Sequence, residues 1–173
     1  MTEPLIDATD LVLTDDVQTE LASARVRAYC RWHIYPSRTE TLTLDGPGGR
    51  LLLLPSLYVT AVASISDSGT LVDAADYDWS QAGMVQRQTG WWSCRYRALA
   101  VTFTHGYDDV PDAVRDVTIS VAKRLPAAMS GVTQEQVGGE SRTYGGLLTA
   151  AAGDTLTDGE KRALAPYALV YRP

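Results

Sequence analysis

The chain has 173 residues, of which 45% are hydrophobic and 21% charged, and its formal net charge at pH 7 is −6. This length suits one domain, or one domain with an arm, and the composition is that of a folded protein rather than a disordered one. Proteins that grip nucleic acid rely mostly on Lys and Arg contacts to phosphates, so the acidic balance argues against such a surface. The acidic balance is compatible with a protein that DNA passes without binding.

Cysteine content and the chain start indicate the compartment. Cys30 and Cys94 are too few for the disulfide framework of a small secreted domain, so we expect two reduced, partly buried thiols. The first residues, MTEPLID, lack the basic-then-apolar order of a signal peptide. The longest strongly apolar run, residues 51–54, is far too short to span a bilayer. We therefore expect a soluble protein used in a reducing cytoplasm.

The first predicted element is a helix over residues 15–31. Its start is indicated by Thr14, Asp15 and Asp16, whose side-chain oxygens can accept hydrogen bonds from the free N–H groups of the first turn. Apolar residues then recur at spacings of four, three and four, and we expect them to form the buried stripe: Val17, Leu21, Ala24 and Ala28. Three residues before Pro36 are interpreted as a plug on the core: Trp32, Ile34 and Tyr35.

Residues 39–105 are expected to form an antiparallel β-meander inserted between two helices. Four to six short strands are indicated by alternating apolar and polar residues between turn signals. Leucines alternate with threonines over residues 41–44, a glycine-rich loop follows at 45–49, and residues 50–54 continue as a second strand. Over residues 58–65 the alternation predicts that one face is shared by Val59, Ala61, Ala63 and Ile65.

The clearest signals lie in VTFTHGYDDVPDAVRD, residues 101–116. Val101, Phe103 and His105 alternate with threonines, which predicts a strand with one packed face. Gly106 then breaks the strand, and Pro111 suits the first position of a helix, where its missing N–H costs nothing. A helix over about 111–125 is predicted by the apolar stripe of Val110, Val114, Val117, Val121 and Leu125.

After Pro126 the chain is expected to leave the core. Residues 127–153 are rich in Gly, Ser, Thr and Ala, which is typical of a flexible segment or of a loop ordered by a neighbour. Thr157 and Glu160 match a capping box, which predicts a short helix at about 158–165, ended by Pro166. The apolar, β-prone end at 167–173 has no evident partner in its own domain and suits strand addition to another chain.

Together these elements predict an α+β fold. It has a small helical core, from about 15–31, 111–125 and a short helix at 158–165, an inserted antiparallel β-meander at about 39–105, and an extended C-terminal arm. We divide the chain into a helical core with its β-insertion, residues 1–126, and a glycine-rich loop with a C-terminal arm, residues 127–173.

Enzymatic hypotheses find little support. The chain has two histidines, His33 and His105. A zinc site built on Cys30 and His33 would need Cys94 and a carboxylate to complete it, so ordinary packing of the thiols is the better interpretation. A serine activated by His105 lacks the G-x-S-x-G elbow. Residues 46–50 lack the ending of a phosphate loop, and residues 73–78 lack the glycine of a calcium loop. We expect no catalytic residues, no metal and no cofactor.

Four aromatic residues leave an alternative open. They could form a platform for a sugar or a peptide, a protein interface, or part of the core: Trp79, Trp91, Trp92 and Tyr96. The sequence does not separate these interpretations. A small aromatic-rich binding module is therefore a second hypothesis from a different functional class.

Three stretches occur in a characteristic order: RVRAYCRWHI (25–34), LDGPGGRLLLLPSLYVTAVASIS (44–66) and THGYDDVPDAVRDVTISVAKRL (104–125). In this order they resemble the head-to-tail adaptor proteins of long-tailed bacteriophages, also called head–tail connector or head-completion proteins. The likeness is greatest to those of actinobacterial siphophages and covers about residues 15–145. It implies a helical core with a β-insertion and no catalytic residues.

The resemblance also implies partners and a location. Adaptors of this family are virion proteins of the neck, assembled in the host cytoplasm, and form a ring beneath the portal that usually matches its twelvefold symmetry. The ring extends the DNA channel and meets a stopper or tail-joining protein. Its C-terminal segment embraces the portal, a role that falls here to about 157–173, with docking residues Tyr167, Leu169, Val170 and Tyr171. A stopper or tail-completion protein is the alternative within this class.

Overall fold

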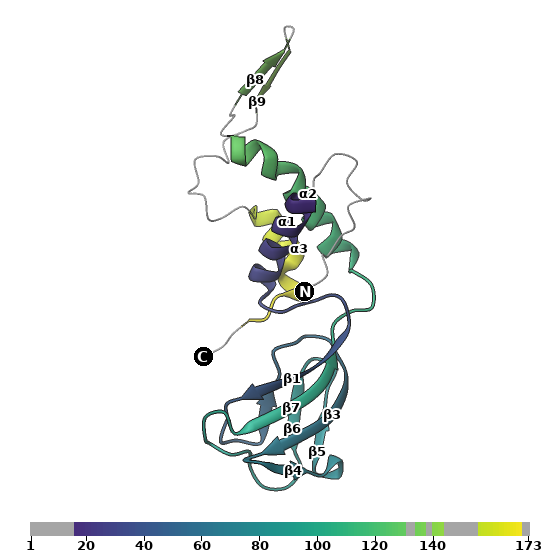
Figure 1. The fold of residues 1–173 in the computed structure, drawn as a ribbon, viewed down its shortest axis with the longest axis vertical. Coiled ribbons are helices and arrows are strands. Elements are labelled where there is room, and N and C mark those ends of the chain that lie inside the picture. Colours follow the sequence, from purple (N-terminus) through teal and green to yellow (C-terminus); the bar gives the residue numbers. More distant parts are fainter. Residues whose placement is uncertain (1–15, 131–133, 138–139, 144–155, 171–173) are drawn as a thin grey trace. The chain divides into compact units, whose positions relative to one another are not determined.

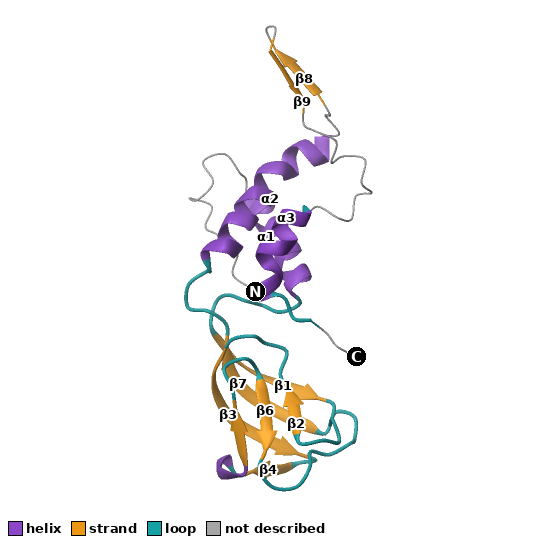
Figure 2. Cartoon of the chain, turned by 180° about the vertical axis from the view of Figure 1, so that it is seen from behind, coloured by secondary structure: helices purple, strands orange, loops and turns teal. Residues whose placement is uncertain are grey.

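The computed structural model describes residues 16–130, 134–137, 140–143 and 156–170. The chain divides into two compact units: a helical unit from Met1–Cys30 and Val110–Pro166, and a β-unit from Arg31–Asp109 and Tyr167–Pro173. The predicted α+β class is confirmed (Figures 1 and 2). In the described ranges no helix has the length and apolar character needed to cross a membrane.

The helical unit contains α1 (Asp16–Cys30), α2 (Asp112–Ser130) and α3 (Asp158–Leu164), with a 3₁₀ turn, η3 (Ala165–Tyr167), after α3. Helix α2 packs against both α1 and α3. The predicted stripe on α2 is confirmed for Val114, Val117, Val121 and Leu125, which are buried, whereas Val110 is half-buried. The core of this unit therefore follows the apolar face that the sequence indicated for its longest helix.

The buried face of α1 differs from the predicted one. Of the predicted stripe, Leu21, Ala24 and Ala28 are exposed, and the side chain of Val17 lies outside the described residues. The residues that are buried instead follow a helical spacing of three, one, three and four: Thr19, Ala22, Ser23, Val26 and Cys30. An apolar pattern misses this face because two of its five members carry hydroxyls. These side chains are short, so they leave room for a neighbouring helix.

Helix α2 is longer than predicted and runs through Pro126 to Ser130. Pro126 removes one intrahelical hydrogen bond, but the alanines that follow it are strong helix formers. The predicted loop at 127–153 is therefore wrong for residues 127–130. It is also wrong for the antiparallel hairpin of β8 (Gln134–Val137) and β9 (Glu140–Thr143). Residues 131–133, 138–139 and 144–153 lie outside the described part.

The capping box at α3 is confirmed. Thr157 Oγ1 accepts a hydrogen bond from the Glu160 backbone N–H at 3.3 Å, and the Glu160 carboxylate accepts one from the Thr157 N–H at 2.8 Å. The same carboxylate lies 2.8 Å from the Arg124 guanidinium of α2, which ties the two helices together. Helix α3 ends at Leu164, and Pro166 lies within η3.

The β-unit contains seven strands and a short 3₁₀ helix: β1 (Arg38–Leu44), β2 (Leu51–Leu53), β3 (Val59–Asp67), β4 (Thr70–Val72), η2 (Ala74–Asp76), β5 (Tyr77–Trp79), β6 (Met84–Arg87) and β7 (Leu99–His105). They form two antiparallel sheets, in the orders β1-β7-β3-β4 and β2-β6-β5. Both sheets contribute to one hydrophobic core, with Ile65, Val101 and Phe103 from the first and Leu52 and Val85 from the second.

Strand β7 confirms the strongest prediction, because Leu99, Val101, Phe103 and His105 alternate as buried residues. The predicted face of β3 is wrong in its middle: Ala61 and Ala63 are exposed, and Val62 packs against the core. Two register shifts against β7 cause this, one between Val59 and Ala61 and one between Val62 and Ser64. An extra residue in a strand turns the following side chains to the other face, which simple alternation does not anticipate.

Candidate functional site

The predicted docking residues begin beside an aromatic cluster of the β-unit. The backbone carbonyl of Tyr167 accepts a hydrogen bond of 2.7 Å from Trp32 Nε1, and the Tyr167 ring meets Tyr107 edge-on, with centroids 6.2 Å apart. The expectation that this chain end has no partner in its own domain is therefore wrong for Tyr167. An indole N–H that is mostly buried needs an acceptor, and the chain end supplies one.

The cluster is built around the turn that follows β7. Tyr107 stacks on Tyr58 with centroids 4.2 Å apart and lies 6.1 Å from Trp32. The Tyr107 backbone N–H donates to the carbonyl of Ile34 at 2.8 Å, and the Gly106 N–H donates to that of Tyr58 at 2.9 Å. The plug predicted before Pro36 is thus confirmed for the buried Trp32 and Ile34, while Tyr35 is half-buried.

Gly106 is required by this geometry for two reasons. Its φ is +102°, a backbone conformation that residues with a side chain rarely adopt. A Cβ built at this position would lie 2.7 Å from His33 Nε2 and 2.8 Å from the Pro36 carbonyl oxygen. The glycine break noted in the sequence is therefore also a point of close approach between two segments.

Two histidines lie under the cluster. The rings of His33 and His105 are 4.9 Å apart, and His105 Nε2 lies 2.9 Å from Glu40 Oε1, which also pairs with Arg38 at 2.8 Å. Burial lowers the pKa of His105; Glu40 acts in the opposite direction without cancelling the effect, and Arg38 adds to the lowering.

This arrangement suits a structural role better than a catalytic one. His105 is only 1% exposed, so a substrate has no access to its ring, and the hydrogen bond recorded for that ring is to a carboxylate rather than a nucleophilic hydroxyl. In the described part of the chain no three His, Cys, Asp or Glu side chains lie close enough to hold a metal ion. Burial raises the pKa of the Cys30 thiol to about 12, so this thiol stays protonated.

The four predicted docking residues are placed differently. Tyr167 and Leu169 are half-buried, Val170 is 79% exposed, and Tyr171 lies outside the described residues. The structure therefore holds Tyr167 against the cluster and leaves Val170 in solvent.

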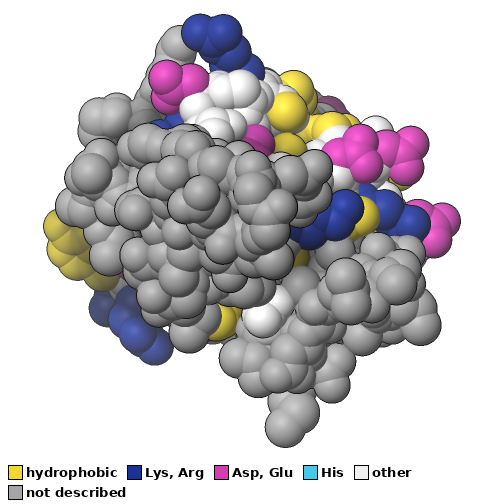
Figure 3. All heavy atoms as spheres, turned by 90° about the horizontal axis from the view of Figure 1, so that it is seen from above, with side chains coloured by type: hydrophobic (Ala, Val, Ile, Leu, Met, Phe, Trp, Pro, Cys, Tyr) yellow, Lys and Arg dark blue, Asp and Glu magenta, His cyan; other side chains and the backbone are white. Residues whose placement is uncertain are grey.

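The aromatic residues left open by the sequence divide into two groups. Trp92 is core: it is 2% exposed, donates from Nε1 to the Arg50 carbonyl at 2.9 Å, and carries the Arg87 guanidinium 5.0 Å from its ring centroid. Trp79, Trp91 and Tyr96 are surface residues, 40%, 69% and 87% exposed. On the face seen in Figure 3, both acidic and basic side chains of the described residues are visible around the grey atoms.

Comparisons with known proteins give a likeness in fold. A scan of protein-family models and a search of curated proteins found no match. One similar solved chain belongs to the neck of an empty GTA particle computed with C6 symmetry, at a TM-score of 0.47 and 17% identity. That match covers 64% of this chain and 65% of the other, so this chain spans less than two thirds of that protein.

A second similar chain belongs to the virion of a native gene transfer agent particle. Its TM-score is 0.52 and its identity 15%, and the match covers 99% of this chain and 87% of the other. The two proteins therefore share a fold over nearly the whole of this chain.

Proposed function

We propose that this chain is a non-enzymatic structural protein of the neck of a phage-like particle, where copies of it form a ring that joins the portal to the tail. The observation that carries the proposal is the shared fold with a chain of a gene transfer agent virion, over 99% of this chain. The sequence likeness to head-to-tail adaptors points to the same place in the particle. It is also the reason for choosing the adaptor position, directly below the portal.

The chemistry of the molecule supports this role. A ring that extends a DNA channel must let the duplex pass without holding it, and a chain with net charge −6 offers phosphates more repulsion than attraction. The buried histidine pair and the protonated Cys30 thiol offer no accessible nucleophile. We propose a ring that matches a twelvefold portal and meets a stopper or tail-joining protein on its other side.

The C-terminal arm is proposed to dock on the portal. Its start is fixed, because Tyr167 is held by Trp32 and Tyr107, and the exposed Val170 follows three residues later. A segment anchored at one end loses less conformational freedom on binding than a fully free one. We assign docking to Leu169, Val170 and Tyr171, with Tyr167 as the anchor on the subunit itself.

The location is tested by cryo-electron microscopy of complete particles. The proposal expects density for this chain as a ring between portal and tail, and density at any other position would overturn it. The same map separates the adaptor from the alternative, a stopper or tail-completion protein, because a stopper ring lies one layer further from the portal and makes no contact with it.

The arm is tested by truncation after Tyr167, which removes residues 168–173 and leaves the hydrogen bond to Trp32 in place. We expect a folded subunit whose binding to isolated portal rings is lost in a sedimentation assay. Trp32→Phe removes the N–H donor that anchors Tyr167 and keeps every residue of the arm, so we expect it to weaken binding without abolishing it. Undiminished binding by the truncated chain would show that the arm is not the anchor.

A second candidate function rests on the exposure of Trp91 and Tyr96. As a binding module, the chain would hold a sugar or a peptide on these rings, and alanine at both positions would abolish binding without unfolding the protein. A glycan and peptide binding screen of the wild type decides between the two functions. A ligand lost on double alanine substitution would favour the module.

A further inference from the structure

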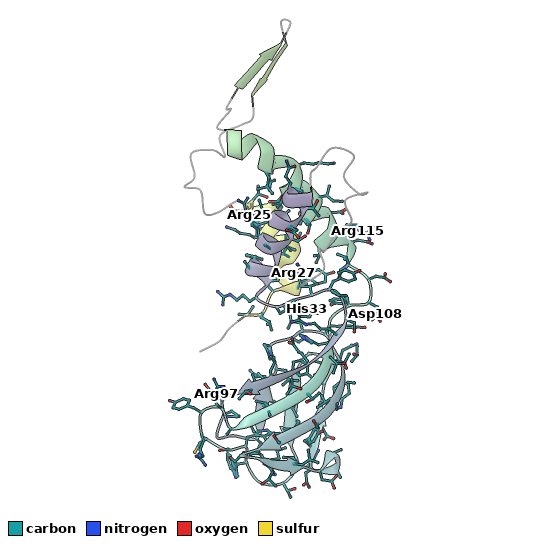
Figure 4. All side chains as sticks on the ribbon, viewed as in Figure 1. Arg25, Arg27, His33, Arg97, Asp108 and Arg115 are labelled. Carbon is teal, nitrogen blue, oxygen red and sulfur yellow. The ribbon has the colours of Figure 1, made fainter. Side chains whose placement is uncertain are left out.

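The loop between β6 and β7 presents an unusual set of exposed side chains. In addition to Trp91 and Tyr96, both Arg95 and Arg97 are exposed (Figure 4). Tryptophan, tyrosine and arginine are the residues most enriched where protein interfaces gain their binding energy. We call residues 91–97 the aromatic–arginine loop.

This loop is held rigid by the neighbouring glycine-rich loop at 45–49. Backbone hydrogen bonds join Gly46 to Arg95 at 2.9 Å, Gly48 to Ser93 at 3.1 Å, and Trp92 to Gly49 at 2.9 Å. A Cβ at Gly46 would lie 2.0 Å from the Ser93 carbonyl oxygen, so the two loops lie in direct contact. The exposed rings are therefore displayed by a fixed backbone, which lowers the entropy lost when they bind a partner.

The charge on the loop is free to act on a partner. None of the ion pairs recorded among the described residues includes Arg95 or Arg97. The Asp45 carboxylate accepts the backbone N–H of Arg97, not its guanidinium, at 2.7 Å. The loop therefore adds two exposed cations to a chain that is acidic overall.

A complementary surface lies on β4, η2 and β5 of the same unit. Asp73 and Asp78 are exposed there, beside two apolar side chains, Leu71 at 71% and Trp79 at 40% exposure. We call these four residues the acidic edge. In Figure 4 Arg97 marks one side of the β-unit. The acidic edge lies nearer the other end of the loop, because Gln88, three residues before Trp91, bonds to Asp76 and Asp78.

We propose that the aromatic–arginine loop of one copy docks on the acidic edge of a second copy, so that subunits associate head to tail through their β-units. The proposal rests on the proposed function only in expecting the contact to close into a ring. Copies with a net charge of −6 repel one another, and pairing the two exposed arginines with two exposed aspartates offsets this repulsion at the contact. A contact between two unlike surfaces is heterologous, and such contacts form rings or filaments rather than symmetric dimers.

The test uses the native Cys94, which is exposed and lies within the aromatic–arginine loop, while Cys30 is buried. Ala75→Cys adds one thiol at the exposed start of η2, next to Asp73. Under mild oxidation of the full chain we expect a ladder of disulfide-linked dimers, trimers and higher species. Adding Cys94→Ser to the Ala75→Cys variant should remove the ladder. Thr43→Cys places the new thiol at an exposed position on β1 instead, and this matched control should give no ladder.

Charge variants then test the recognition itself. In the Ala75→Cys background, Arg95→Glu with Arg97→Glu should slow ladder formation at least about tenfold, as should Asp73→Lys with Asp78→Lys. Mixing the two variants should restore cross-linking, because each now offers the charge that the other lacks. Asp73→Asn with Asp78→Asn removes the charge and keeps acceptors for the hydrogen bonds from Ala75 and Gln88, so it controls for local unfolding.

Equal ladders from Ala75→Cys and Thr43→Cys would overturn the proposal, as would a rate unchanged by the arginine substitutions. If those substitutions leave the ladder intact but abolish binding to portal rings or to an oligonucleotide, the loop has a different partner. The outcome is separable from that of the proposed function. If the chain forms a ring in the neck but the cysteine variants give no disulfide ladder, the proposed contact is refuted and the neck assignment stands. If the ladder and its charge rescue are observed but the chain lies outside the neck of the particle, the neck assignment is refuted and the contact stands.

Discussion

Gly106→Ala tests whether the turn after β7 is fixed by backbone conformation, by close packing, or by both. At a φ of +102° the alanine costs about 1–2 kcal/mol in conformational strain. Its Cβ would also lie 2.8 Å from the Pro36 carbonyl oxygen and 3.1 Å from that of Ile34, which are backbone atoms and cannot swing aside. Such overpacking adds about 1–3 kcal/mol. We therefore expect a loss of about 2–5 kcal/mol in the free energy of unfolding.

Two other glycines of the β-unit separate these contributions. Gly90 has a φ of +74° with no atom within 4 Å of a built Cβ, so Gly90→Ala should cost only the strain, about 1–2 kcal/mol. Gly49 has neither a positive φ nor a neighbour within 4 Å. Gly49→Ala should therefore be neutral, or stabilising by up to about 1 kcal/mol through the unfolded chain.

The assay is urea-induced unfolding followed by tryptophan fluorescence. All four tryptophans lie within Arg31–Asp109, so their fluorescence reports the β-unit and not the helical unit: Trp32, Trp79, Trp91 and Trp92. The expected order of destabilisation is Gly106→Ala, then Gly90→Ala, then Gly49→Ala. Equal losses for the first two would refute the packing argument, because conformational strain alone would then account for both.

Three further predictions concern titration and the helical unit. Burial lowers the pKa of His105, so just below pH 6.5 the unfolded state binds more protons than the folded state. The β-unit should therefore lose stability when the pH falls from about 7.5 to about 5.5. Thermal melts of the His105→Asn variant should lack this loss. For Glu160, burial would raise the pKa, but the hydrogen bonds from Arg124 and Thr157 outweigh it and lower the pKa below 4.5. Glu160→Gln should therefore cost about 0.5–1 kcal/mol at pH 7 and nothing once the pH falls below the lowered pKa, as measured by circular dichroism. On α1, Leu21→Gln should change the free energy of unfolding by less than about 0.5 kcal/mol, whereas Val26→Ala should lower it by about 1–3 kcal/mol. If urea melts gave the larger loss for Leu21→Gln, the buried face would be the one predicted from the sequence.

The sequence was most informative where one physical cause determined the structure. The alternation in β7 and the stripe on α2 were both correctly read, because each element packs one apolar face on a core. It failed where burial did not follow hydrophobicity. On α1 the buried face includes Thr19 and Ser23, and on β3 two register shifts reverse the alternation.

The candidate site could be predicted only in part. The apolar end was recognisable, but the attachment of Tyr167 to Trp32 joins residues 135 positions apart, and nothing local signals it. Likewise, Trp91 and Trp92 are adjacent and identical in type, and only the fold assigns one to the surface and the other to the core. Such assignments depend on which segments meet in space, and a periodic pattern in one segment does not contain that information.

The division into units has a consequence for how the molecule is made. Residues 31–109 leave the ribosome in one block, whereas α1 is synthesised before them and its partners α2 and α3 after them. At typical elongation rates of about 5–20 residues per second, α1 therefore waits roughly 5–20 seconds before α2 is complete. During that interval the β-unit can fold while Ala22, Val26 and Cys30 have no helix to cover them. Among the described elements, the first helix to be synthesised is thus one of the last to be buried.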